Sequence, residues 1–370
     1  MYIYYLLFFL LIVGYNIYNN GSKSFITIKG NKYSKYVIFA TVCLTLIMGL
    51  RAETVGSDTE QYAVRYANTL ARFALGRENP EIGFDALQLV FYQFLNIGYN
   101  GFIFFIALVC SLSMGYFINK YAKDELTALF VFIMLLLSMY MSGIRQCTAL
   151  SLCIGAFVMA DKRKPLLYII FMALAYTIHN SCIVFLPVYL LWYIRLTRFQ
   201  ALLVFLFSIS ALIYRPYVTP IIEYLAPAKY EDMAFNMNYA INPIVLAVSV
   251  SMILFALFLV PVEDDGKKKK LSQLDSVFYI FMCIYLFFQI MSISNGQLWR
   301  LSFYYTLGFI ALVPNTIWNN KKMDKSSKSL VRFIICFMCI LHFFIGIRGD
   351  ILQIDDYKFF WEDVHIGYNG

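Results

Sequence analysis

Five polar residues of this chain could carry out chemistry, because each stands at the edge of a long apolar run. They are Arg51 and Asp58 in GLRAETVGSDTEQY, Arg145 in SGIRQ, His179 in TIHNS and Arg300 in GQLWRLSFYY. Charged residues make up only 14% of the chain and apolar ones 61%, so a charge beside an apolar run is costly and needs a reason. Such an arginine can bind an anion, and a histidine or carboxylate can accept a proton from a hydroxyl.

Arg145 and Arg300 favour binding of phosphate. A planar guanidinium matches two phosphate oxygens at once. The acidic residues nearest to Arg145 in sequence, Glu125 and Asp161, are far from it along the chain, and Arg300 opens an apolar run with Tyr304 about one turn further on. The alternative for Arg145 is a side chain that reaches the lipid headgroups and has no chemical role.

Arg51, Asp58 and His179 have both functional and structural interpretations. Arg51 is followed by Glu53 and Asp58, which predicts either a local ion-pair network or a carboxylate that orients or deprotonates a sugar hydroxyl. His179 ends an apolar run and is followed by polar residues, which suits either a hydrogen-bonded helix end or a general base, because imidazole titrates near neutral pH.

The elements that must position these residues are membrane-spanning helices. Apolar stretches recur from end to end, each near the length that crosses roughly 30 Å of hydrocarbon as a helix. The predicted fold is an all-α, polytopic helical bundle of about twelve spans. The spans are 2–18, 36–50, 101–118, 126–142, 146–160, 166–179, 182–194, 199–214, 241–262, 276–293, 301–318 and 331–347.

The placement of basic residues predicts the orientation. If the short polar-apolar segment 84–98 is an interfacial or re-entrant helix and does not cross, one side receives 20 of the 30 Lys and Arg, including DKRK, KKKK and KKMDKSSK. The basic side is cytoplasmic. Both termini and all five polar candidates then face outward, which is the main argument that they form one site.

One transmembrane domain, residues 1–350, is predicted, with an outward-facing tail at 351–370. Its long outer connections are 51–83 and 215–240, and the second could cover the membrane surface as a lid. The first apolar run is read as an uncleaved span, because it lacks a basic start and a small-residue cleavage site.

Composition also excludes several classes of protein. The eight cysteines lie almost wholly in apolar runs, which indicates small core residues and no disulfide framework or zinc site. The net charge of +8 arises from topology and does not indicate nucleic-acid binding. The chain has no HExxH, CxxC, Gly-rich phosphate loop or GxSxG, and no outward Asp-x-Asp that would hold a metal on a nucleotide sugar. No metal and no cofactor are therefore expected.

At these residues the chain resembles the EpsG-like and Wzy-type polysaccharide polymerases of bacterial membranes. The similarity runs from about residue 1 to 320, and each motif alone is weak, but their order and spacing are fairly specific. The matching pieces are GLRAETVGSDTEQY, EIGFDAL, SGIRQCTALSL, LAYTIHNSCIVFLPVYLL and LWRLSFYYTLGFIALVP.

The resemblance implies a GT-C-like, metal-independent glycosyltransferase in the cytoplasmic membrane, with its active site on the outer face. Such enzymes join repeat units carried on undecaprenyl diphosphate, and a chain-length regulator is an expected partner beside the membrane lipids. We assign proton transfer to His179 or Asp58 and diphosphate binding to the three arginines. The candidate set is His179, Asp58, Arg145, Arg300 and Arg51, with Gln146, Tyr304 and Tyr217 as substrate contacts.

Three other functions remain open on the sequence. A flippase or solute transporter would favour charges near mid-span, whereas here they stand at the outer ends. An O-antigen ligase shares the fold and the donor but uses lipid A core as acceptor. A membrane O-acyltransferase would place its histidine inward, opposite to the side predicted for His179.

Overall fold

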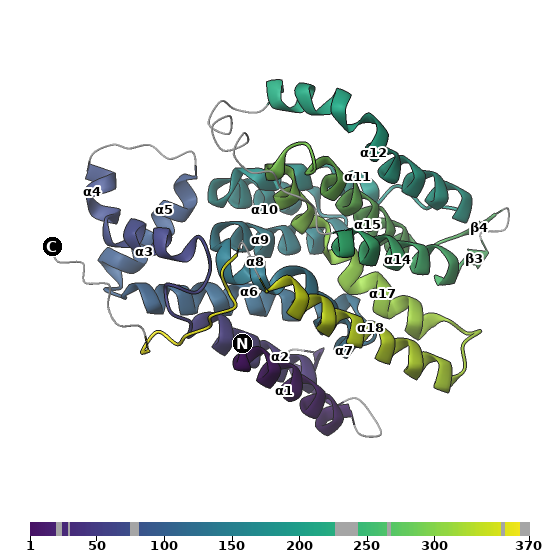
Figure 1. The fold of residues 1–370 in the computed structure, drawn as a ribbon, viewed down its shortest axis with the longest axis horizontal. Helices are drawn as coiled ribbons and strands as arrows, with labels where there is room; N and C mark the ends of the chain where they lie inside the picture. Colours follow the sequence, from purple (N-terminus) through teal and green to yellow (C-terminus); the bar gives the residue numbers. More distant parts are fainter. Residues whose placement is uncertain are drawn as a thin grey trace. The chain divides into compact units, whose positions relative to one another are not determined.

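The computed structural model describes residues 1–19, 24–28, 30–74, 81–225, 243–264, 268–348 and 352–362. These residues are mostly helical (Figure 1), which confirms the predicted all-α polytopic fold. The chain forms two compact units. The first comprises residues 1–121, 136–186 and 343–370, and the second comprises residues 122–135 and 187–342.

The first unit contains the N-terminal helices and the centre of the chain. Its closest helix pairs are α2 with α6 and α9 with α10. Its elements are α1 (Tyr2–Asn19), the hairpin of β1 (Phe25–Ile28) and β2 (Asn31–Ser34), α2 (Lys35–Gly49), α3 (Thr59–Ala67), α4 (Thr69–Ala74), α5 (Ile82–Leu89) with a π-helical turn (Val90–Phe94), α6 (Tyr99–Tyr121), α8 (Ser138–Ser142), α9 (Ile144–Asp161), α10 (Pro165–Ile178) and a 3₁₀ helix (Asn180–Phe185).

Local sequence explains where these helices begin and end. Ser34 caps α2, and its hydroxyl accepts a hydrogen bond from the Val37 amide. Pro165 stands in the first turn of α10, where its missing N–H costs nothing. That helix ends at Ile178, and the next residue, His179, has an extended backbone, so the imidazole stands at the junction with the following 3₁₀ helix.

The second unit contains the C-terminal helices. Within it, α15 packs against α12, α14 and α17. Its elements are α7 (Glu125–Phe132) with a π-helical turn (Ile133–Leu137) that continues into α8, α11 (Val188–Leu191), α12 (Arg198–Leu225), α14 (Pro243–Leu259), the hairpin of β3 (Glu263–Asp264) and β4 (Lys269–Lys270), α15 (Gln273–Met291), α16 (Trp299–Ser302) between two 3₁₀ turns (Gly296–Leu298 and Phe303–Tyr305), α17 (Leu307–Asn319) and α18 (Lys325–Gly346).

Close backbone approach and one buried ion pair organise the second unit. A Cβ on Gly308 of α17 would lie 2.5 Å from the Phe278 carbonyl oxygen of α15, so only glycine permits this helix spacing. At the start of α7, the buried Asp124 forms an ion pair with Arg332 of α18, in which Oδ2 and Nε are 2.7 Å apart. Such pairing is expected of a charge buried among membrane helices, because an unpaired charge there is costly.

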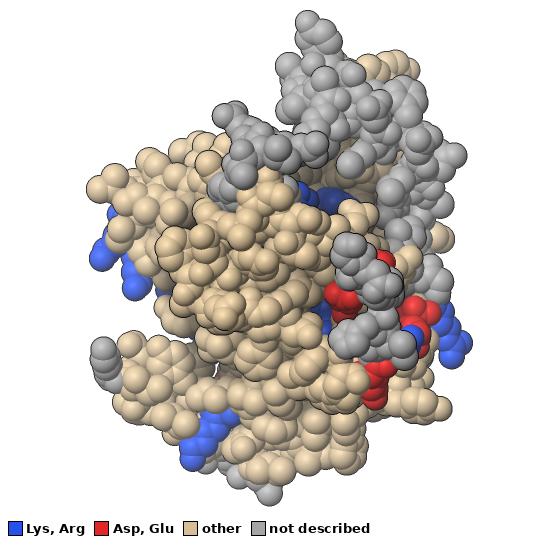
Figure 2. Space-filling view, turned by 90° about the vertical axis from the view of Figure 1, so that its left-hand side faces the viewer, with Lys and Arg blue, Asp and Glu red and all other residues tan. Residues whose placement is uncertain are grey.

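Seven helices in the described part of the chain are long and apolar enough to cross a membrane, and four shorter apolar helices accompany them. The eleventh predicted span, 301–318, is divided among α16, a 3₁₀ turn and α17. On the face seen in Figure 2, uncharged surface dominates and the acidic side chains gather in one area. Helical structure is found within each of the twelve predicted spans. The number of helices that cross the membrane stays a prediction.

Two sequence predictions need correction. The connection predicted to begin at 215 begins later, because α12 continues to Leu225 with Pro216 and Pro220 inside it; membrane helices tolerate such prolines. The predicted span 182–194 is not one α-helix, since it is a 3₁₀ helix followed by the single turn α11 after Pro187. Residues 226–242, which hold the rest of the predicted lid, lie outside the described part.

The C-terminal segment 352–362 is an integral part of the first unit. The Tyr4 hydroxyl donates a 2.7 Å hydrogen bond to the Ile354 carbonyl, and Tyr357 donates to the Ile47 carbonyl at 2.9 Å. Backbone bonds join this segment to residues 50–57, namely Ser57 to Leu352, Gly56 to Gln353, Ala52 to Lys358 and Phe360 to Leu50. The tail thus braces the segment that carries Arg51 and Asp58.

Candidate active site

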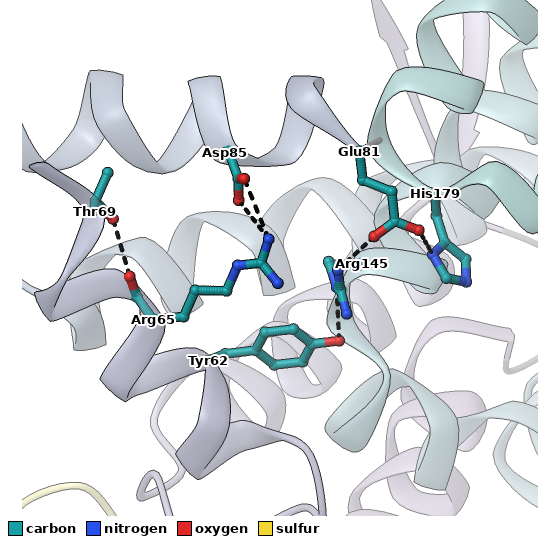
Figure 3. A network of polar contacts seen from close by, with 7 residues as sticks. All are labelled: Tyr62, Arg65, Thr69, Glu81, Asp85, Arg145 and His179. Atoms are coloured by element: carbon teal, nitrogen blue, oxygen red, sulfur yellow. Dashed lines mark hydrogen bonds and ion pairs between the residues drawn. The ribbon is translucent and has the colours of Figure 1, made fainter. Parts of the chain in front are cut away.

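A single buried carboxylate joins two of the predicted site residues (Figure 3). His179 Nδ1 donates to Glu81 Oε1 at 2.6 Å, and Arg145 Nη1 donates to Glu81 Oε2. The Asn180 amide lies 3.4 Å from the same Oε1. Residues that are far apart in sequence therefore converge on one side chain of the first unit.

Helix ends place these three groups. Glu81 immediately precedes α5, Arg145 lies in the first turn of α9, and His179 follows the last turn of α10. Close packing of α5 on α10 requires Gly83, because a Cβ there would lie 2.3 Å from Thr177 Oγ1. The glycine brings the start of α5 within reach of the imidazole.

Tyr62 of α3 holds the other side of Arg145. Arg145 Nε donates to Tyr62 Oη at 3.1 Å, and the guanidinium carbon lies 5.2 Å from the centre of the tyrosine ring. A guanidinium has five N–H groups. Among the described residues these bonds occupy two of them, so three remain for an anion.

A second ion pair lies one turn further along α5. Arg65 of α3 donates to both Asp85 carboxylate oxygens, at 3.0 and 3.2 Å. Glu81 and Asp85 are four residues apart, so both carboxylates lie on one face of α5, opposite Tyr62 and Arg65 of α3 (Figure 3). This second pair joins α3 to α5 beside the first, and we call Tyr62, Glu81, Arg145 and His179 the polar cluster.

The electrostatics of this polar cluster keep Glu81 ionised. Burial on its own raises the pKa of the Glu81 carboxyl, but the hydrogen bond and charge of His179 and the charge of Arg145 outweigh burial and lower the pKa to about 2. The Glu81 side chain is only 5% exposed, whereas Arg145 is 22% and His179 16% exposed. The cation and the imidazole, but not the carboxylate, can thus meet a ligand.

Asp58 lies beside the segment that leads into Arg145. The turn before it needs glycine, because Gly56 has φ +108° and a Cβ there would meet the Met141 carbonyl at 2.4 Å. Ser57 and Ser142 hydroxyls are 2.8 Å apart, and the Asp58 amide donates to Ser142 at 3.4 Å. Asp58 also starts the helix turn that ends at Tyr62, whose amide donates to the Asp58 carbonyl.

Arg51 occupies a different environment. It is 3% exposed, and its guanidinium donates to the Val55 carbonyl at 3.3 Å and to the Met48 carbonyl. The sequence predicted that it orders Asp58 or contacts diphosphate. The bonds observed tie the end of α2 to the following turn, and the role of Arg51 at the substrate stays a prediction.

The remaining candidates are divided between the units. Gln146 follows Arg145 in α9 and is buried. Arg300 lies half-buried in α16 of the second unit, where Tyr304 is completely buried and Tyr217 of α12 is exposed. A sugar contact by Tyr304 would require this side chain to become accessible, whereas Tyr217 needs no such change.

Sequence reasoning missed Glu81 as a site residue. EIGFDAL was part of the family resemblance, but neither of its carboxylates was given a role. The signal was present in their spacing, because two acidic residues four apart in an apolar segment demand cationic partners on one face. Arg145 and Arg65 are those partners, and no spacing rule connects them to α5 in sequence.

An apolar groove of about 470 Å³ lies elsewhere in the first unit, between α2 and α6. Most of its lining is apolar, and two of its lining hydroxyls, those of Thr41 and Thr45, donate to the backbone carbonyls of Val37 and Thr41, respectively. The groove therefore presents little that could hold a charged group, and the polar cluster is the better candidate for an active site.

Comparison with known proteins supports one assignment. The sequence model of the EpsG family matches residues 34–359, which include all of the polar cluster. No curated protein and no solved structure gives a significant match.

Proposed function

The chain belongs to the EpsG family, and from this premise we propose that it is a lipid-linked oligosaccharide polymerase. The family and the apolar helices make it a membrane protein of polysaccharide biosynthesis. The finer proposal is a metal-independent glycosyltransferase that joins repeat units carried on undecaprenyl diphosphate, at the outer face of the bacterial cytoplasmic membrane. The products would be surface polysaccharides such as O-antigen, capsule or exopolysaccharide.

One observation carries this proposal. Glu81 binds an arginine with one carboxylate oxygen and a histidine with the other, so a site for an anion and a proton acceptor lie side by side. Glycosyl transfer from a lipid diphosphate needs both groups. The leaving diphosphate requires positive charge, and the attacking hydroxyl requires a base.

The proposed step balances without an added reagent. The acceptor hydroxyl oxygen attacks the anomeric carbon of the donor sugar, and its proton passes to His179 Nε2. The bond from that carbon to the diphosphate oxygen breaks, and its electron pair stays on undecaprenyl diphosphate. Arg145 stabilises the charge that develops there with its remaining N–H groups.

The other candidate residues take supporting roles in the proposal. Asp58 is the alternative base, and Arg300 is a second cation for the diphosphates of donor or acceptor. Gln146, Tyr304 and Tyr217 are proposed substrate contacts. A chain-length regulator is the proposed protein partner.

The test is complementation of a strain that lacks the gene for this chain, followed by gel analysis of surface polysaccharide. Arg145→Ala and Arg300→Ala should each abolish long polymer while the protein still inserts in the membrane. Arg195→Ala is the control, because this arginine also pairs with a glutamate, Glu263, and has no proposed role in the reaction. Long polymer made normally by both first variants would refute the proposed phosphate binding.

The deletion strain itself separates the alternative functions. Single repeat units on the surface, without a ladder, indicate loss of a polymerase. Loss of every modified lipid A indicates a ligase, and failure to export any unit indicates a flippase. Either of the last two results would overturn the proposed reaction.

A further inference from the structure

We propose that Glu81 is the positioning residue of this site, which orients His179 as a base and holds Arg145 at a set distance from it. This inference rests on the proposed function. It adds a residue that has no role in the prediction from sequence, and it makes the carboxylate the link between proton transfer and phosphate binding.

The first argument is the state of the imidazole. A carboxylate that accepts a hydrogen bond from Nδ1 places the proton on that nitrogen, so Nε2 carries the lone pair in the neutral ring. Among the described residues no hydrogen-bond partner of His179 Nε2 is seen. When the base takes a proton, the positive charge forms directly beside Glu81, which stabilises it.

The second argument is the sharing of one carboxylate. Because Oε1 and Oε2 belong to the same rigid group, the imidazole and the guanidinium cannot separate without breaking one of two charge-assisted hydrogen bonds. Glu81 is itself held, since it starts α5 and the fit of Gly83 against Thr177 fixes that helix on α10. Such fixed supports are what place reacting groups accurately.

The third argument is that the neighbouring groups do not duplicate this role. The elements packed against α10 are α5, α9 and the 3₁₀ helix after it. Among the interactions seen in the described residues, Glu81, which immediately precedes α5, is the charged side chain that contacts the imidazole. These elements carry other charged or titratable side chains as well. The others are Asp85 on α5, Arg145, Cys147, Cys153 and Asp161 on α9, and Cys182 on the 3₁₀ helix.

Asp85 is a natural control. It lies one turn from Glu81 on the same helix, its side chain is 7% exposed, and it is also paired with an arginine, Arg65. Asp85→Asn therefore removes a buried, paired carboxylate from α5 and leaves the hydrogen bonds seen from His179 and Arg145 in place. A loss of stability that follows from removing any such carboxylate should appear both in Asp85→Asn and in the test variant, Glu81→Gln.

The first measurement does not depend on the reaction. Diethyl pyrocarbonate modifies only neutral imidazole, so the rate of carbethoxylation of His179 against pH, resolved by peptide mass spectrometry, reports its titration. In Glu81→Gln the inflection should move about one unit to lower pH, because the stabilising negative charge is gone. In Asp85→Asn it should stay within a few tenths of a unit of the wild type.

The second measurement is polymer formation in the complemented deletion strain. Glu81→Gln should reduce long polymer at least tenfold at equal protein level, and Asp85→Asn should leave most of it. Should Glu81→Gln fail to accumulate, Glu81→Asp replaces it. This variant keeps the charge, so the inflection should remain while polymer falls, because the shorter side chain cannot hold both partners.

The outcomes separate this inference from the proposed function. An unchanged inflection in folded Glu81→Gln, or normal polymer from it while Arg145→Ala makes none, would overturn the role of Glu81 and leave the polymerase proposal standing. Normal polymer from both Arg145→Ala and His179→Ala would overturn the polymerase proposal, whatever the titration of His179 shows.

Discussion

Arg51 and Arg145 lie in the same unit, and each stands at the edge of a long apolar run, yet their side chains donate to different acceptors. Arg51 donates to the carbonyls of Met48 and Val55, is 3% exposed, and lies in a segment braced by the C-terminal tail. Arg145 donates to a carboxylate and a phenol, and 22% of its side chain is exposed.

This difference separates two uses of an arginine beside an apolar run. A guanidinium whose donors serve backbone carbonyls in a buried turn stabilises the fold. A guanidinium held from one side by a carboxylate, with donors still available and partial exposure, is prepared to receive an anion. Three experiments test whether the molecule divides these roles as the contacts indicate.

The largest expected effect is on stability, in Arg51→Ala. Two buried carbonyls lose a charged donor, so the free energy of unfolding should fall by about 3 kcal/mol. The unfolding temperature and the monodisperse fraction in detergent should both drop, and activity should fall in proportion to folded protein. If Arg51→Ala instead keeps the wild-type unfolding temperature and makes no polymer, Arg51 acts on the substrate and the comparison fails.

The second expected effect is a pH dependence of stability that comes from Glu81, the partner of Arg145, and has no counterpart at Arg51. The folded pKa of Glu81, about 2, lies below its ordinary value of 4.5, so its ion pairs stabilise the fold above about pH 4.5 and lose this effect as pH falls toward 2. The difference in free energy of unfolding between the wild type and Glu81→Gln should narrow by about 2 kcal/mol from pH 5 to pH 3.

The carbonyl partners of Arg51 do not titrate in this range. The difference in free energy of unfolding between the wild type and Arg51→Ala should therefore stay constant from pH 5 to pH 3. Thermal unfolding across this range measures both differences. A constant difference for Glu81→Gln would contradict the lowered pKa of Glu81.

The smallest expected change in stability is in Gly83→Ala. The new Cβ would lie 2.3 Å from Thr177 Oγ1, so α5 must shift on α10 at a cost of about 1 to 2 kcal/mol. A shift of the Glu81 carboxylate should reduce polymer formation about tenfold. Gly98→Ala is the control, since no atom lies within 4 Å of its added Cβ. Equal activity of the two variants would show that the packing of α5 does not set the site.

Much of the architecture could be predicted because membrane helices depend on local composition. The ranges 2–18, 101–118 and 126–142 all coincide with helices long enough to cross a membrane. The predicted helix boundaries were wrong near prolines, because proline occurs both in connections and inside membrane helices. The predicted connection 215–240 contains Pro216 and Pro220, which lie inside α12, and Pro187 interrupts the predicted span 182–194.

The site could be predicted only in part, for a different reason. Arg145 and His179 were identified because an isolated charge or imidazole beside an apolar run needs a partner. Glu81 was not assigned a role, because it lies 64 residues from Arg145 and 98 residues from His179 in sequence. No local sequence pattern predicts contacts over such distances along the chain. The bracing of residues 50–57 by the tail was missed for the same reason.

Hydrophobic length and charge placement, which are properties of the sequence itself, determined that this chain is a helical membrane protein and which residues were candidates for chemistry. Tertiary structure decided which candidates work together. Ion pairs and close helix contacts depend on distances of a few ångströms between segments remote in sequence, so only the folded first unit distinguishes the arginine that stabilises a turn from the one that shares a carboxylate with a histidine.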